Sequence, residues 1–174
     1  MNTQHGIRLG SAALGVVIAA GFLLGTTASA GDAAGKIVLS GYADGAGGES
    51  LLAKNYGAII DELGAHGVSF TQDPVAASTN LCIAYIMTHD WAKADGACDQ
   101  AIRVAKLDTP TGTLYERINH DQEVGLAYSN RAVLRSLEAH PKDAASDLAR
   151  AVALAPSSEL VMRNRAALTG ATGS

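Results

Sequence analysis

The feature that most constrains the fold of this chain is the spacing of small and apolar residues within residues 125–158. Apolar residues recur there every three or four positions, as they do on one face of an amphipathic helix. Pro141 divides the run, because proline restricts the residue before it and suits the first turn of a helix. Pro156 ends the run. The pattern therefore predicts two short helices that pack face to face through Ala132, Ala144 and Ala151.

The composition favours the same kind of packing. Aromatic residues make up only 5% of the chain, while alanine is abundant. A core with few large rings has to bring its elements close together on small side chains, which favours paired helices over a sheet. We therefore predict an all-α fold.

Residues 125–158 resemble the tetratricopeptide repeat (TPR), a helix–turn–helix unit of about 34 residues. The second helix of that repeat has a fixed order of small and large apolar positions followed by a proline. Four residues of this chain match that order, namely Ala144, Leu148, Ala151 and Pro156.

Other parts of the chain repeat the pattern. The triplet Asn130-Arg131-Ala132 recurs one repeat length later as Asn164-Arg165-Ala166. Upstream, Leu81, Cys82 and Tyr85 match a segment of the first helix of the family, with Cys82 in the place of a glycine. Since a single unit does not bury both of its faces, such units are expected to stack on one another.

The resemblance implies a short right-handed TPR-like superhelix of antiparallel helix hairpins, closed by a C-terminal capping helix. Its predicted parts are a degenerate unit at 45–66, a full unit at 74–107, an insert at 108–124, a full unit at 125–158 and a capping helix at 159–169. The insert either extends the following helix or forms a flap. Outside this TPR-like domain we expect a signal peptide at 1–30, a flexible N-terminal segment at 31–44 and a tail at 170–174.

The first thirty residues have the order of an export signal. Arg8 precedes an apolar run over residues 9–25, and the small residues Ala28-Ser29-Ala30 follow it. This order predicts cleavage before Gly31 and a periplasmic protein with no stable insertion in the membrane. The alternative, an uncleaved membrane anchor, is disfavoured because the run is short and contains glycines.

Cys82 and Cys98 are the only two cysteines of the chain. They lie equally far on either side of Asp90, near the predicted turn between two antiparallel helices, and therefore at a similar height along the pair. An oxidising compartment permits a bond between them, so we predict a disulfide. The alternative is two buried free thiols that pack as small apolar residues.

Several kinds of chemistry are disfavoured by the sequence. The net charge is −4, and nucleic-acid binding requires a basic stripe. The glycine-rich segment 36–50 has no lysine after its glycines, as a phosphate-binding turn would need. The histidines of the predicted exported chain (His66, His89, His120 and His140) have neither metal-ligand spacing nor a nearby nucleophile. We expect no metal, no cofactor and no enzymatic activity.

Asparagine occurs at the same place in three predicted first helices, as Asn80, Asn130 and Asn164. In the family that the chain resembles, first helices line a concave groove, and asparagine there bonds to the backbone of an extended peptide. A carboxamide suits this role because it has both a donor and an acceptor. The resemblance implies further groove residues at Thr79, Ile83, Met87, Ser129, Val133 and Arg163.

The alternative for the asparagines is that each bonds within the protein scaffold. If Asn130 serves the groove instead, Asn130→Ala should weaken partner binding with little loss of stability.

The function that these features favour is a non-enzymatic protein–protein interaction module of the bacterial cell envelope, which binds a peptide or protein segment in its concave groove. The resemblance does not name the partner. The alternative is a structural subunit that self-associates as a homo-oligomer or joins a larger envelope assembly.

Overall fold

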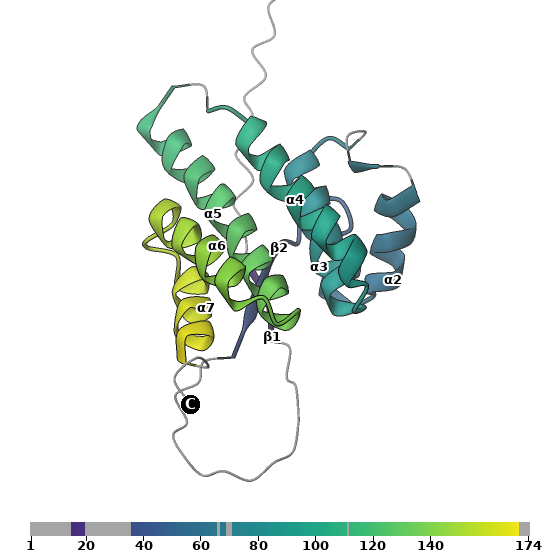
Figure 1. Cartoon of the computed structure of the whole chain (residues 1–174). Helices are drawn as coiled ribbons and strands as arrows, with labels where there is room; N and C mark the ends of the chain where they lie inside the picture. Colours follow the sequence, from purple (N-terminus) through teal and green to yellow (C-terminus); the bar gives the residue numbers. More distant parts are fainter. Residues whose placement is uncertain (1–14, 20–35, 66, 69–70, 111, 171–174) are drawn as a thin grey trace, which may run out of the picture.

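The computed structural model describes residues 15–19, 36–65, 67–68, 71–110 and 112–170 (Figure 1). Its elements in chain order are the strands β1 (Gly15–Ala19) and β2 (Val38–Tyr42), the short helices α1 (Gly48–Leu52) and α2 (Tyr56–Ile59), a π-helical turn η1 (Ile60–Gly64), and the longer helices α3 (Pro74–Met87), α4 (Trp91–Leu107), α5 (Leu114–Leu137), α6 (Pro141–Leu154) and α7 (Glu159–Gly170).

The long helices pack as antiparallel pairs. Helix α3 pairs with α4, α5 pairs with α6, and α7 packs against both α5 and α6 (Figure 1). Contacts between α4 and α5 join the two pairs. The prediction of a mostly helical fold with antiparallel helix pairs is therefore confirmed.

Local signals define where the helices begin. The Asp73 carboxylate accepts a hydrogen bond from the Ala76 N–H at 2.9 Å, and Pro74 occupies the first turn of α3. Thr113 and Glu116 form a reciprocal capping box at the start of α5. The box lies inside the predicted insert at 108–124. Residues 114–124 of that insert are therefore the first part of α5, and the insert extends the following helix.

The α5–α6 contact depends on small residues, as the spacing of alanines predicts. Ala132, Ala144 and Ala151 are all buried. At Gly125, an added Cβ would lie 2.7 Å from the Ala155 Cβ and 3.2 Å from the Ala151 carbonyl oxygen. The two helices therefore approach too closely here for any side chain at position 125.

The strand β2 corrects two predictions, the all-α fold and the flexible segment at 31–44. All five residues of β2 are buried, and the strand lies among α3, α5 and α7. Leu39 belongs to the core around Ile59, Ile83 and Leu134, while Tyr42 belongs to a second core. The strand thus connects the two cores. Three asparagines form hydrogen bonds with its buried backbone groups.

The strand β1 pairs with β2 in an antiparallel two-stranded sheet, with Ile18 opposite Leu39 and Val16 opposite Gly41. It lies within the predicted signal peptide. The rest of that peptide, the predicted cleavage point at Gly31, residues 31–35 of the predicted flexible segment and residues 171–174 of the predicted tail lie outside the described residues. Within the described part of the chain, no helix is long and apolar enough to cross a membrane.

The predicted disulfide is present in the structure. Cys82 of α3 and Cys98 of α4 are bonded, and their Cα atoms are 4.8 Å apart. Both residues are buried between the helices of the first pair.

We predict that the purified protein has no reactive thiol when it is denatured without a reductant. Replacing both cysteines with alanine should lower the free energy of unfolding by about 3 kcal/mol, since the bond restricts the unfolded chain. Thiol labelling and urea denaturation measure the two effects. Labelling of two thiols per chain would show that packing alone holds the pair.

Candidate functional site

The candidate site consists of the sides of α3, α5 and α7 against which β2 packs, and we call this site the groove. Each helix contributes one of the predicted asparagines: Asn80 from α3, Asn130 from α5 and Asn164 from α7. All three are almost completely buried, at 1% exposure or less.

Each asparagine bonds to one residue of β2 through both ends of its carboxamide. The Asn130 Oδ1 accepts a hydrogen bond from the Ser40 N–H at 2.9 Å, and its Nδ2 donates one to the Ser40 carbonyl at 2.8 Å. Asn80 makes the same pair of bonds with Tyr42, at 2.9 and 2.8 Å. Asn164 does so with Val38, at 2.8 and 2.7 Å. We call this arrangement the asparagine ladder.

The ladder engages every second residue of β2 because of strand geometry. Successive residues of a strand point their peptide groups to opposite edges, so one edge presents residues 38, 40 and 42 about 7 Å apart. The asparagines on α3, α5 and α7 bond to residues 42, 40 and 38 in turn. Since they contact only the backbone, they hold an extended segment without reading its side chains.

Two of the asparagines also connect the ladder to the scaffold. The Asn80 Nδ2 donates to the Ala46 carbonyl at 2.9 Å, and the Asn164 Nδ2 donates to the Ser129 Oγ at 2.9 Å. Both buried carboxamides therefore use their second N–H as well. A satisfied buried network of this kind holds one register of the strand.

The other predicted groove residues have different positions. Thr79, Ile83, Ser129 and Val133 are buried, and Met87 is partly buried against the core. Arg163 is exposed on α7 and forms an ion pair with Glu159 at 2.9 Å. The structure thus gives the asparagines to the protein's own strand and buries most of the predicted wall residues. Whether they also bind a partner stays a prediction.

The sequence contained a signal for this strand. The apolar run over residues 37–42 is typical of a short buried strand, and polar or glycine residues follow it. The prediction of a flexible segment at 31–44 overlooks this signal.

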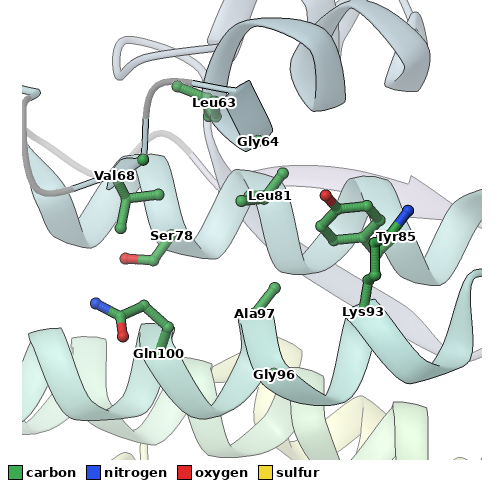
Figure 2. Close-up of a pocket in the computed structure, with 11 residues that line it drawn as sticks. Leu63, Gly64, Val68, Ser78, Leu81, Tyr85, Lys93, Gly96, Ala97 and Gln100 are labelled. Carbon is green, nitrogen blue, oxygen red and sulfur yellow. The ribbon is translucent and has the colours of Figure 1, made fainter.

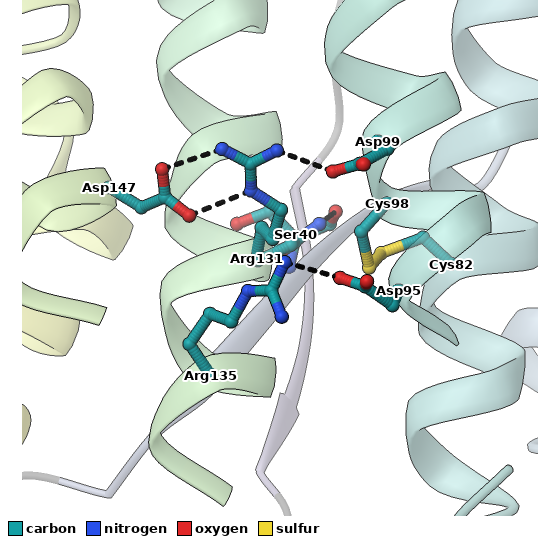
Figure 3. The surroundings of a disulfide bond; sticks show 9 residues. Ser40, Cys82, Asp95, Cys98, Asp99, Arg131, Arg135 and Asp147 are labelled. Atoms are coloured by element: carbon teal, nitrogen blue, oxygen red, sulfur yellow. Dashed lines mark hydrogen bonds and ion pairs between the residues drawn. A yellow bond between two sulfur atoms is a disulfide. The ribbon is translucent and has the colours of Figure 1, made fainter. Parts of the chain in front are cut away.

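On the side of α5 facing α4 and α6, Arg131 occupies a network of ion pairs (Figure 3). Its guanidinium makes two bonds of 2.7 Å to Asp147 of α6 and a third to Asp99 of α4. The hydrogen bonds that Arg131 donates to Asp147 are the main cause of the raised pKa of the Arg131 guanidinium. Arg135 binds Asp95 of α4 at 2.6 Å. The network joins α4, α5 and α6 around a hollow of about 350 Å³.

A second hollow of about 330 Å³ lies between η1 and the α3–α4 pair (Figure 2). Most of its lining is apolar, including Leu63, Val68 and Leu81. Tyr85 and Lys93 stand at one end of it (Figure 2). Among the described residues, no three His, Cys, Asp or Glu side chains lie together as a possible metal site.

The C-terminal end of β2 lies in an acidic environment. Burial raises the pKa of Glu123 to about 7, and the charges of Asp108 and Asp73 add to the effect. Burial also raises the pKa of the Tyr42 hydroxyl, with Glu123 as the next cause.

No protein family, curated protein or solved structure in the comparisons matches this chain. The function is therefore argued from the geometry of the site.

We predict that Asn130→Ala lowers the free energy of unfolding by about 2–5 kcal/mol, because it leaves the buried N–H and carbonyl of Ser40 without partners. This replaces the small loss expected from the sequence. The control is Asn119→Ala, on the same helix but outside the ladder, and it should change stability by about 0.5 kcal/mol or less. Urea denaturation measures both, and equal effects would contradict the ladder.

We predict that stability falls as pH rises from about 4.5 to about 7. The folded state keeps Glu123 protonated up to its pKa of about 7, whereas the unfolded chain releases this proton near the ordinary glutamate pKa of 4.5. The contribution is therefore fully present below 4.5 and absent above 7. Its size is on the order of 1–3 kcal/mol.

Glu123→Gln should remove this part of the pH dependence, and Glu62→Gln, on the exposed surface of η1, controls for the change of charge. Urea denaturation between pH 5 and pH 8 measures it. Parallel curves for the wild type and Glu123→Gln would show that Glu123 is ionised in the folded protein.

Proposed function

We propose that this protein is a non-enzymatic interaction module of the bacterial cell envelope, which binds an extended segment of a partner protein beside the strand β2 that occupies its groove. The observation that carries the proposal is the asparagine ladder. Three helices each hold the backbone of an extended strand through both ends of one carboxamide. A groove with these contacts is suited to main-chain recognition.

We also propose that the scaffold is a short TPR-like array. Support comes from the two antiparallel helix pairs and from the recurrence of Asn-Arg-Ala on α5 and α7. The equivalent position of α3 holds Asn80, and all three asparagines perform the same task. Equal roles at equal places are what repeated units produce.

Location in the cell envelope is supported by the disulfide and by the export signal. Disulfides persist in oxidising compartments and are rare in the cytosol. The order of charge, apolar run and small residues in 1–30 supports export by an independent route.

The arginines on the side of α5 that faces α4 and α6 have a structural role. Arg131 and Arg135 are engaged by Asp147, Asp99 and Asp95. Their charges already have partners, and they serve to hold three helices together. The module acts by presenting a rigid surface.

A second candidate function is self-association, favoured by an exposed apolar patch where α4 ends and α5 begins. The patch consists of Leu107, Leu114, Tyr115 and Ile118, each more than half exposed. Exposed apolar residues gathered at one place are typical of protein contacts. Light scattering over a range of concentrations measures this directly.

Site-specific photo-cross-linking in the periplasm tests the proposed function. A photoreactive residue at Lys36, exposed near the N-terminal end of β2, should give an adduct with another protein. The same residue at Ala149, exposed on α6, is the matched control and should give none. An adduct between two copies of the chain, or equal labelling at both positions, would overturn the proposal.

A further inference from the structure

The strand β2 has a second edge that the asparagine ladder does not use. The peptide groups of residues 38, 40 and 42 point to the asparagines, so those of Leu39 and Gly41 point the opposite way. That edge faces β1. Leu39 stands opposite Ile18, and Gly41 stands opposite Val16.

The strand that covers this edge belongs to the predicted signal peptide. The principal contact of β1 in the fold is with β2, whereas β2 also packs on α3, α5 and α7. Removal of residues 1–30 therefore takes away β1 and leaves the helices and β2 in place. The edge is then free in the exported protein.

We propose that this edge accepts an extended apolar segment of a partner protein, which adds to β2 as an antiparallel strand in the place of β1. The inference rests on the proposed function and names the surface that performs it. The asparagines do not contact the partner. They hold β2 as a fixed template to which the partner's backbone bonds.

The chemistry of the partner segment follows from the strand that lies there now. β1 is five residues long, with the sequence GVVIA, and carries no charge. Its β-branched residues favour an extended chain. In strand addition, main-chain hydrogen bonds supply affinity and alternate side chains supply specificity. A short, uncharged segment rich in valine and isoleucine is therefore the expected ligand.

The template is held rigidly enough for this role. A Cβ at Gly41 would lie 2.5 Å from the Leu51 Cδ2 and 2.9 Å from the Ile83 Cδ1, so β2 packs closely against these side chains. An edge with unpaired N–H and C=O groups is a ready acceptor for another strand. Because β2 does not have to be ordered on binding, less entropy is lost.

In the full-length chain, β1 competes with any added strand. A tethered segment has an effective concentration in the millimolar range. It therefore excludes a free peptide of the same sequence that is present at a much lower concentration. Variants of β1 therefore report on the edge. Proline at Val16 and Ile18 removes N–H groups that face β2, whereas proline at Val17 removes one that faces away.

The test measures binding of a fluorescent peptide to the full-length protein. The peptide has the sequence of residues 13–21 with lysines added at each end for solubility. The Val16→Pro/Ile18→Pro protein should bind it roughly tenfold or more tightly than the wild type, and Val17→Pro should bind it like the wild type. Circular dichroism and the intact disulfide establish that each variant is folded.

Methylated peptides identify the bonds. N-methylation at the positions of Val16 and Ile18 should weaken binding roughly tenfold or more, since it removes both main-chain donors, while N-methylation at the position of Val17 should leave it unchanged. Three results would each overturn the inference. The first is an equal effect of the methyl group at all three positions, the second is no binding by the folded double variant, and the third is dimerisation of that variant in place of peptide binding. A partner cross-linked at Lys36 would in that case still support the proposed function.

Discussion

The paired hydrogen bonds between three asparagine carboxamides and the backbone of β2 are the interaction on which the rest of the structure depends. They satisfy peptide groups that are buried at the centre of the protein, where an unpaired group costs about 1–3 kcal/mol. These bonds allow β2 to lie among the helices α3, α5 and α7. Once it lies there, Leu39 and Tyr42 fill two separate cores and bind them into one body.

The ladder also changes what the groove presents to other molecules. In an empty groove the asparagines would face a partner directly, but here the protein's own strand completes them. We propose that recognition uses the opposite edge of that strand, which β1 covers in the full-length chain. Two close contacts elsewhere hold the helices that carry the ladder. These are the α5–α6 contact at Gly125 and the Cys82–Cys98 bond between α3 and α4.

Helix pairs could be predicted from this sequence because their signals are local. Asp73 with Pro74 and the break at Pro141 stand next to the elements that they define. The places of two of the asparagines were predictable for a similar reason, since Asn130 and Asn164 begin the same triplet, Asn-Arg-Ala, in the sequence. The strand that the asparagines bind was not predictable, because Asn164 and Val38 are 126 residues apart and no local pattern links them. The run at 37–42 indicated a strand, but only the tertiary structure identifies what satisfies its backbone.

Native-state hydrogen exchange on the full-length protein, measured residue by residue, tests the central claim most directly. The amides of Val38, Ser40 and Tyr42 donate to buried carboxamides, so they should exchange only through global unfolding, as the amides of the α3 core do. Exchange of these three amides at the rate of an exposed loop, with the helices still protected, would contradict the account. It would show that the strand does not lie in the groove.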